Sequence, residues 1–280
     1  MQIFERTMKT TYSADGTCIA FWKTGSGPPL LLVHGGVCDH LAWYFVTPLL
    51  AQRFTVYSFD RRGRGSSGDT PPYAVEREVE DILAMLSTIG EPAHLLGHSA
   101  GGILALAVAE RRSDLLSLML YEPAFIVDGA RERPGPEVLE RIQSLLAAGD
   151  RDEVLRIAMR ETVAIPESEI KAMRSTPGWE HLRNVAHTIP YDWMVWERQL
   201  VPQNLIGLHM PVLLLIGSHS PSWLHAGSRA IHADLPHAQV IELQGQGHSA
   251  MVSDPGLFAR EIQRFVDECG TASENIPAES

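Results

Sequence analysis

Short apolar runs alternate with longer segments of helical periodicity along the first 121 residues. Four runs are apolar enough to form strands buried on both faces of a sheet: Leu30–Val33, Phe54–Phe59, Ala93–Leu96 and Leu115–Tyr121. Three segments between them carry helical patterns: about Leu41 to Ala51, Ala74 to Ile89 and Ala100 to Arg111. Strands that alternate with helices predict a mostly parallel sheet with helices on both faces.

The two ends of the chain extend this sheet. Near the N-terminus, Phe4–Tyr12 and Thr17–Lys23 alternate around Asp15-Gly16, which predicts an antiparallel hairpin. Toward the C-terminus, two apolar runs predict strands and a last amphipathic segment predicts a helix: Val212–Ile216, Gln239–Leu243 and Pro255–Glu268.

The strand–helix alternation stops at Glu122-Pro123, and helical patterns alone follow until about Leu208. Four helices are predicted there: Glu137–Ala148, Arg151–Val163, Glu167–Arg174 and Trp179–Gln199. We therefore expect a core made of residues 1–124 and 208–280, with a helical cap over residues 125–207 inserted between two of its strands.

Charge and cysteine content exclude several classes of protein. The formal net charge of −11 over 280 residues argues against a nucleic-acid partner. The three cysteines are neither an even set for disulfides nor spaced as zinc ligands. The first residues lack an apolar signal core, and no apolar run reaches membrane-spanning length. We expect a cytoplasmic protein, monomeric or homodimeric, with no membrane partner.

The most informative motif is Gly97-x-Ser99-x-Gly101, which lies between a predicted strand and a predicted helix. This pattern is typical of a nucleophile elbow, a strained strand-to-helix turn that exposes a serine hydroxyl. The two glycines allow the strand and the helix to pass close to each other without a Cβ clash. Ser99 is therefore the candidate nucleophile.

Three other motifs accompany the elbow in the order His34-Gly35-Gly36, Asp60-Arg61-Arg62-Gly63 and, after the last predicted strand, Gly247-His248. Together the four motifs resemble the α/β-hydrolase superfamily, and the resemblance covers nearly the whole chain. It implies an α/β-hydrolase fold with a helical cap after the sixth strand, and acyl transfer to water through an acyl-serine, without cofactor or metal.

The resemblance also implies roles for individual residues. A serine needs a base within hydrogen-bond reach, and His248 stands where the family places its catalytic histidine. His34 and His98 are poorer candidates, because the former is expected to brace its turn and the latter to pack under the elbow. The oxyanion hole is expected to use the backbone N–H groups of Ala100 and Gly36, with Val37 as the alternative to Gly36.

The acid of the triad departs from the commonest family pattern. The usual position after the seventh strand holds Ser220, and Gly217–Ala233 contains no Asp or Glu. A neutral serine cannot stabilise an imidazolium as a carboxylate does. The alternative position, at the end of the sixth strand, holds Glu122, so Glu122 is the predicted acid and Asp128 the second choice. Asp60, Arg61 and Arg62 are interpreted as a turn held by local ion pairs.

Carboxylic ester or lactone hydrolysis is the preferred function. The position of Glu122 resembles that of zearalenone-lactone hydrolases, which open an aromatic macrolactone. A bulky hydrophobic substrate is expected to contact the predicted cap through Trp179, Trp193, Met194 and Trp196, although packing inside the cap is the simpler interpretation of such rings. Three alternatives remain open. The protein cleaves a carbon–carbon bond in a diketone, it hydrolyses an amide, or it is a degenerate homologue that only binds a small hydrophobic ligand.

Overall fold

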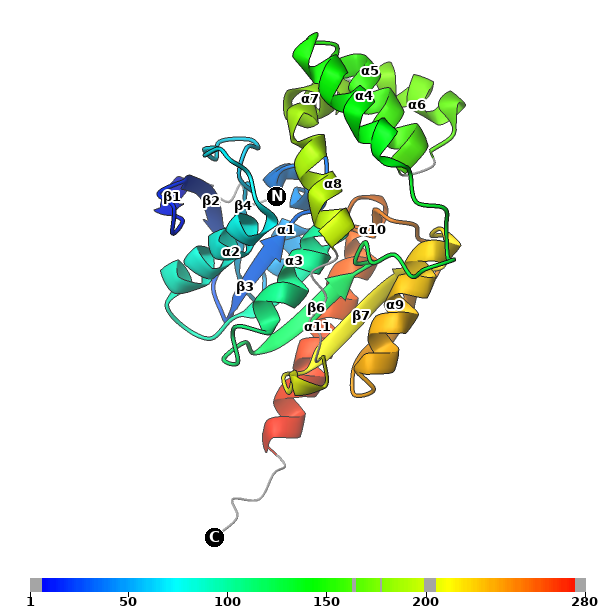
Figure 1. Ribbon diagram of the computed structural model, residues 1–280. Helices are drawn as coiled ribbons and strands as arrows, with labels where there is room; N and C mark the ends of the chain where they lie inside the picture. Colours follow the sequence, from blue (N-terminus) through cyan, green and yellow to red (C-terminus); the bar gives the residue numbers. More distant parts are fainter. Residues whose placement is uncertain (1–6, 163–164, 177, 199–204, 275–280) are drawn as a thin grey trace.

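The computed structural model describes residues 7–162, 165–176, 178–198 and 205–274 (Figure 1). Its strands form one sheet in the order β1-β2-β4-β3-β5-β6-β7-β8. Their bounds are β1 Met8–Tyr12, β2 Cys18–Thr24, β3 Pro29–Val33, β4 Thr55–Phe59, β5 His94–His98, β6 Ser117–Tyr121, β7 Val212–Gly217 and β8 Gln239–Leu243.

Strands β3 to β8 run parallel, and β1 and β2 add an antiparallel edge. The parallel register pairs Val33 with Gly97 and His98 with Tyr121, so β3, β5 and β6 end side by side. The loops that follow these strands therefore meet at one edge of the sheet, where open α/β sheets bind their ligands. The predicted α/β-hydrolase fold with its mostly parallel sheet is confirmed.

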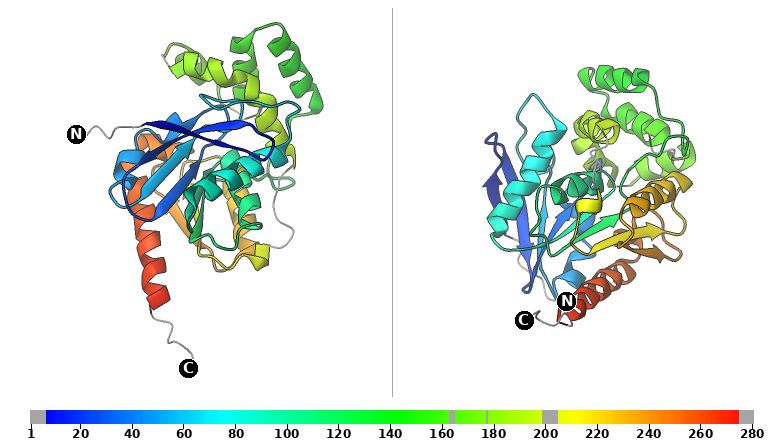
Figure 2. Two further views of the ribbon diagram at one scale, coloured as in Figure 1. Left: turned by 90° about the vertical axis from the view of Figure 1, so that its left-hand side faces the viewer. Right: turned by 60° about the horizontal axis from the view of Figure 1, so that its bottom comes forward.

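Helices cover both faces of the sheet (Figure 2). On one face lie α2 (Val75–Ile89), α3 (Ala100–Ala109) and α9 (Ser222–Asp234). On the other lie α1 (Thr47–Leu50), α10 (Ala250–Ser253) and α11 (Pro255–Glu274). Every residue of α3 is buried, which explains why its sequence is apolar all round rather than amphipathic.

The chain between β6 and β7 forms the helices that we call the helical insert: α4 Pro136–Ala147, α5 Arg151–Ile157, α6 Glu167–Arg174, α7 Gly178–Val185 and α8 Ile189–Arg198. Helices α4 to α7 gather beyond one edge of the sheet, and α8 lies between them and the core (Figure 1). The insert has an apolar cluster of its own, which includes Ile142, Leu155 and Trp193. The division into separate domains at residues 125–207 stays a prediction.

Two predicted helices are broken where proline stands near the start of a new helix. The segment from Leu41 to Ala51 forms a 3₁₀ turn at His40–Trp43 and then α1, whose first turn contains Pro48. The segment from Trp179 to Gln199 forms α7, a short 3₁₀ turn and α8, whose second residue is Pro190. Proline lacks an N–H and clashes with the preceding turn, so it is tolerated only where a helix begins.

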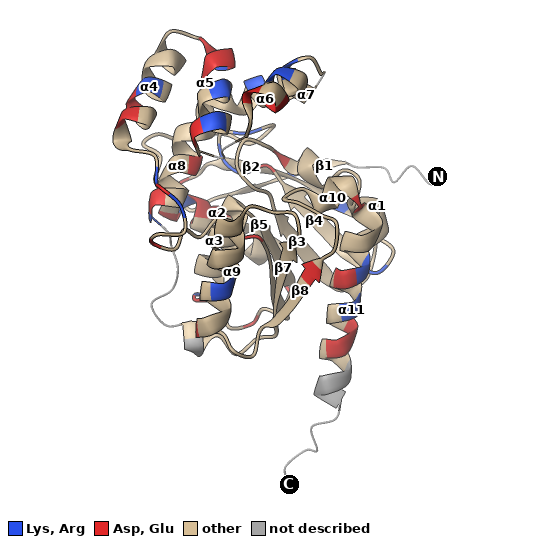
Figure 3. Cartoon of the chain, turned by 90° about the vertical axis from the view of Figure 1, so that its right-hand side faces the viewer, with Lys and Arg blue, Asp and Glu red and all other residues tan. Residues whose placement is uncertain are grey.

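The other predicted elements agree with the structure to within a few residues, except for two helices. The helix from Arg151 ends at Ile157 and continues as a π-helix over Ala158–Thr162, and the helix from Pro255 extends to Glu274 instead of ending at Glu268. Phe4, Val163 and Gln199, which ended predicted elements, lie outside the described residues. Within the described part of the chain, no helix is long and apolar enough to cross a membrane. Acidic and basic residues are interspersed on α4 to α7 (Figure 3), as expected for surfaces in contact with water.

Candidate active site

Ser99 stands at the turn between β5 and α3 with φ 53° and ψ −120°. The close approach of strand and helix leaves no room for side chains at the two motif glycines. A Cβ on Gly101 would lie 2.4 Å from the backbone oxygen of His34, and one on Gly97 would lie 2.5 Å from the oxygen of Gly101. The elbow predicted from Gly97-x-Ser99-x-Gly101 is therefore present, with both glycines required by backbone contacts.

Backbone strain is concentrated at the predicted site. Among the described residues, the non-glycine residues with positive φ are Val37 at 51°, Ser99 at 53° and Glu122 at 44°. They follow β3, β5 and β6, whose ends lie side by side. Such conformations cost on the order of 1–3 kcal/mol each and persist only where the surroundings hold them. The sequence motifs predict all three residues as candidates for the site.

Glu122 is fully buried and joins two strand ends to the loop of His248. Its Oε2 lies 2.5 Å from Nδ1 of His248, and its Oε1 accepts a hydrogen bond of 2.6 Å from the N–H of Gly217, the last residue of β7. Because a carboxylate only accepts, we assign the proton to Nδ1, which leaves Nε2 of His248 as the nitrogen able to take a proton.

The loop of His248 is held from two more sides. The hydroxyl of Tyr121 donates to the carbonyl of Gly247 and accepts from the N–H of Ala250. Nε2 of His98 donates to the carbonyl of His248 over 2.9 Å. Burial lowers the pKa of His98 well below its usual value, and the neighbouring His248 lowers it further, so His98 is neutral and serves as a donor. The expectation that His98 packs under the elbow is confirmed.

Ser99 itself is half-buried, and its Oγ makes no hydrogen bond to any residue that the structure describes. Its neighbour His98 brings the elbow close to the candidate base, since the rings of His98 and His248 have centroids 4.6 Å apart. Catalytic hydrogen bonds are often long before substrate binds. The transfer of a proton from Ser99 to His248 stays a prediction.

The candidate oxyanion donors are the backbone N–H groups at the start of α3 and in the loop after β3. Within the described residues, neither Ala100 nor Gly36 donates its N–H to another group. The N–H of Val37, the alternative to Gly36, donates to Oδ2 of Asp192 over 2.9 Å. The geometry therefore leaves Gly36 and Ala100 available, and their role stays a prediction.

His34 braces the same loop, as expected. Nδ1 of His34 donates to the carbonyl of Gly35 over 2.9 Å, and its Nε2 accepts from the N–H of Arg61 over 3.1 Å. Burial lowers the pKa of His34 well below its usual value, and the charges of Arg61 and Arg64 lower it further. A neutral histidine fixed through both nitrogens is a structural group.

The arginines after β4 are held by buried carboxylates. Arg61 pairs with Glu78 over 2.6 Å and Arg62 with Asp81 over 2.7 Å. The arginines are thus ion-paired as predicted, but the expectation of local pairs within the turn is wrong, because the acids are supplied by α2. Burial raises the pKa of Glu78, but the charges of Arg61 and Arg64 more than offset this effect and bring the pKa to about 2. Glu78 is thus a firmly ionised partner.

Sequence reasoning missed one residue of the site, Asp192 on α8. Its Oδ1 accepts from Arg64 over 2.7 Å and from Arg61 over 3.1 Å, while its Oδ2 accepts from Val37. Asp192 lies 155 residues after Val37 in the chain, and no local pattern distinguishes it from a solvent-exposed aspartate at the start of a helix.

The four predicted substrate-binding side chains differ in their surroundings. Trp179 and Trp193 are buried in the apolar cluster of the insert, and Trp196 packs against that cluster. Nε1 of Trp179 donates to Oδ1 of Asp152 over 2.5 Å, so packing accounts for this ring completely. Met194 is 38% exposed. Contact of any of the four with a substrate stays a prediction.

The alternative acids are placed differently from Glu122. The side chain of Asp128 is 96% exposed and pairs with Arg133 over 3.1 Å. Ser220, at the commonest family position, buries its Oγ without a hydrogen-bond partner among the described residues. Only Glu122 among these three candidates bonds to His248.

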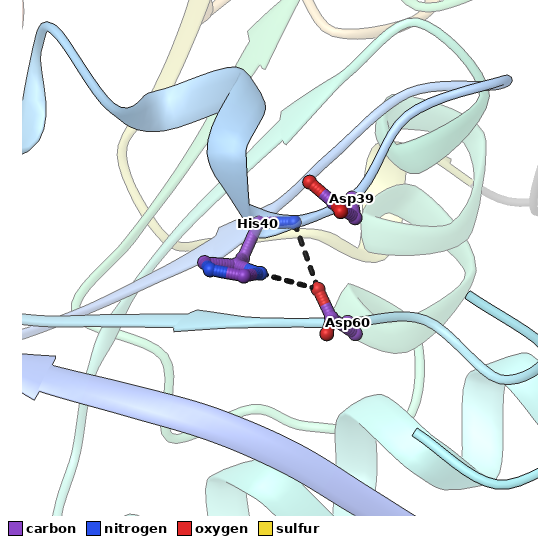
Figure 4. Close-up of side chains that lie close together, drawn as sticks. All are labelled: Asp39, His40 and Asp60. Carbon is purple, nitrogen blue, oxygen red and sulfur yellow. Dashed lines mark hydrogen bonds and ion pairs between the residues drawn. The ribbon is translucent and has the colours of Figure 1, made fainter. Parts of the chain in front are cut away.

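One group of possible metal ligands is present in the described residues, formed by Asp39, His40 and Asp60 (Figure 4). Nδ1 of His40 lies 2.6 Å from Asp60, whose other oxygen accepts from the N–H of Ser66. Asp39 accepts from the N–H of Leu41 at the start of the 3₁₀ turn. These hydrogen bonds account for the positions of all three side chains, so we propose no metal site here.

Comparison with known proteins gives a consistent picture. A model of the alpha/beta hydrolase family matches residues 30–261. An alpha/beta hydrolase structure from Sphaerobacter thermophilus is 36% identical, with TM-score 0.84 over 92% of this chain and 99% of that chain. The pimeloyl-acyl-carrier-protein methyl ester esterase of Aeromonas hydrophila is 26% identical over 87% of this chain and 97% of its own. The enol-lactonase from Burkholderia xenovorans, 19% identical with TM-score 0.70 over 92% and 99% of the two chains, shares the fold.

Proposed function

The chain belongs to the alpha/beta hydrolase family, and from this premise we propose that it is a serine hydrolase that cleaves a carboxylic ester or lactone through an acyl-serine intermediate. The observation that carries the proposal is the hydrogen bond between Glu122 and Nδ1 of His248, beside a serine held in the strained elbow. A base with its second nitrogen free and a carboxylate behind it is the arrangement that activates a serine hydroxyl.

Acylation begins when Nε2 of His248 takes the proton of Ser99 Oγ and this oxygen attacks the carbonyl carbon of the substrate. The negative oxygen of the tetrahedral intermediate accepts hydrogen bonds from the N–H groups of Ala100 and Gly36. Glu122 stabilises the imidazolium formed on His248. The intermediate collapses when the bond to the alkoxy oxygen breaks and His248 returns the proton to that oxygen.

Deacylation repeats these steps with water as the nucleophile. His248 takes a proton from the water, the hydroxide adds to the acyl carbon, and Ser99 leaves with the proton that His248 returns. An ester gives an acid and an alcohol. A lactone gives one hydroxy acid, because its alcohol is attached to the acyl chain.

The substrate proposed is a small-molecule ester or lactone with a bulky hydrophobic group, and a cytoplasmic location forms part of the proposal. The Aeromonas relative is named as an esterase of a methyl ester, which supports ester cleavage. The apolar side chains of the insert, Met194 among them, support a bulky acyl or alcohol group.

Turnover of a panel of nitrophenyl esters and macrolactones by the wild-type protein and by Ser99→Ala tests the proposal. We expect hydrolysis of at least one member by the wild type and a loss of several orders of magnitude in the variant. Binding of these compounds without hydrolysis would favour a degenerate binding protein. Cleavage of diketones or amides in place of esters would assign another reaction to the same residues.

A further inference from the structure

The helical insert contacts the loop of the proposed oxyanion hole through the carboxylate of Asp192. Asp192 lies in the first turn of α8, and its Oδ2 accepts the N–H of Val37 over 2.9 Å. A Cβ built on Gly36 would lie 3.0 Å from the same oxygen, so the carboxylate rests directly against the backbone of this loop. Asp192 is thus in contact with two consecutive residues of the loop after β3.

Asp192 contacts the loop at its strained residue, Val37. Val37 has φ 51°, and a β-branched residue in this conformation is a true outlier that its surroundings must hold. The hydrogen bond from its N–H to Asp192 provides such a hold. Because of this bond, the N–H of Val37 is not available to donate a hydrogen bond to a substrate oxygen.

The charge of Asp192 is balanced within the protein. Its Oδ1 accepts from Arg64 over 2.7 Å and from Arg61 over 3.1 Å, and both guanidinium groups are buried. Arg61 in turn donates to the carbonyl of Gly35 over 2.9 Å. The loop is therefore fixed at Gly35 by an arginine and at Val37 by the carboxylate that this arginine binds.

We propose that Asp192 is a positioning residue that holds the loop Gly35-Gly36-Val37 and so presents the N–H of Gly36 to the oxyanion. The inference rests on the proposed serine hydrolase function. Because Asp192 belongs to α8, the oxyanion hole is complete only while α8 lies on the core. The helical insert therefore takes part in the chemical step as well as in covering the site.

The test is the acylation rate constant, measured as the pre-steady-state burst of nitrophenol from a nitrophenyl ester and expressed per titrated active site. Asp192→Asn and Asp192→Ala should lower it on the order of 10- to 100-fold, somewhat less than loss of a whole oxyanion donor. Titration counts only folded, competent sites, and the asparagine variant keeps the volume if the alanine variant fails to fold.

The matched control is the adjacent residue Tyr191, which also joins α8 to the core. Its hydroxyl donates to Oδ2 of Asp69 over 2.7 Å, away from the oxyanion loop. Tyr191→Phe removes one hydrogen bond between insert and core and should change the acylation rate by less than about threefold, the scale of an exposed bond. Equal rates for the Asp192 variants and Tyr191→Phe would overturn the inference.

A rescue variant separates positioning from a general structural role. Glycine adopts positive φ without strain, so Val37→Gly needs no anchor to keep the loop conformation. We expect the cost of Asp192→Asn to be at least about threefold smaller when combined with Val37→Gly. An unchanged cost in that background would contradict positioning through Val37.

If the wild type itself gives no burst and no acyl-enzyme, the proposed function fails together with this inference, whereas a normal burst confines any failure to Asp192.

Discussion

The carboxylate of Glu122 lies 2.5 Å from Nδ1 of His248, although the two residues are 126 positions apart in the chain. Glu122 directly follows β6 in a left-handed conformation, and its second oxygen accepts a hydrogen bond from the N–H of Gly217 at the end of β7. The strand that most often supplies the acid in this family here supplies a backbone donor that orients a glutamate from the neighbouring strand. The ends of β6 and β7 thereby fix the carboxylate that holds His248, which lies in the loop after β8.

Replacing Glu122 by Gln should lower kcat by roughly 10²–10⁴-fold, by analogy with the loss of the buried aspartate in serine proteases. Glutamine keeps the volume but lacks the negative charge, and it can favour the other histidine tautomer. The kcat of Glu122→Asp should lie between those of the wild type and Glu122→Gln, because the shorter side chain must reach one methylene further. Steady-state kinetics on a nitrophenyl ester measures both effects.

Asp128→Asn is the control for this prediction, since Asp128 is exposed and pairs only with Arg133 among the interactions described for it. Its activity should stay near that of the wild type. Full activity in Glu122→Gln together with inactivity in Asp128→Asn would identify Asp128 as the acid. Full activity in both would mean that Ser99 and His248 work as a pair.

Ser99→Ala and His248→Ala should each lower turnover by several orders of magnitude, and the double variant should lose little more than either. The reason is that the two residues act as one unit, so removal of either abolishes the covalent route. A double-mutant comparison of kcat checks the prediction. Losses that multiply in the double variant would show that the residues act independently.

His94 should make folding stability depend on pH below neutrality. Burial lowers its pKa from 6.5 to about 4, so between these values the unfolded chain takes up a proton that the folded protein does not. The contribution of His94 to the free energy of unfolding is fully present above pH 6.5. It declines by about 3 kcal/mol as the pH falls toward 4. Urea unfolding of the wild type and His94→Asn at pH 7 and pH 4 should show a smaller decline in the variant; an equal decline would refute this assignment.

Substitutions in the insert should have different effects on stability and KM, depending on how buried the side chain is. Trp179→Phe loses the hydrogen bond to Asp152 and part of a packed ring, so it should lower the free energy of unfolding by about 1–3 kcal/mol with KM unchanged. Met194→Ala, at a 38% exposed position, should leave stability within about 0.5 kcal/mol. A changed KM in Met194→Ala would place that side chain against substrate, and unchanged KM values in both variants would leave packing as the sole role of these two side chains.

Local patterns predict the sheet and several structural features of the candidate site. The alternation of apolar runs with helical segments gave the order of strands and helices, and Gly97-x-Ser99-x-Gly101 gave the elbow with its two backbone contacts. The lack of Asp and Glu in Gly217–Ala233, together with the position of Glu122 after a predicted strand, predicts Glu122 as the acid. The signal for the elbow lies within the motif itself, whereas the second signal for Glu122 lies in a segment that begins 95 residues further along the chain.

The remaining features depend on contacts between distant segments. Pro190 carries a local signal for the start of α8, so the prediction of one continuous helix from Trp179 to Gln199 was wrong on local grounds. Asp192 is different, because its contacts with Val37, Arg61 and Arg64 arise only when α8 is seated on the core. The surroundings of Trp179 and Trp193 likewise follow from how the helices of the insert pack, which periodicity alone does not determine.

The most direct test of the account is covalent labelling with a fluorophosphonate, followed by mass spectrometry of the intact protein and of its peptides. The serine mechanism predicts one adduct per chain, on Ser99, formed by the wild type and absent from Ser99→Ala. His248→Ala and Glu122→Gln should form it much more slowly than the wild type. A wild-type protein that hydrolyses esters without an adduct, or an adduct on a residue other than Ser99, would contradict the central claim.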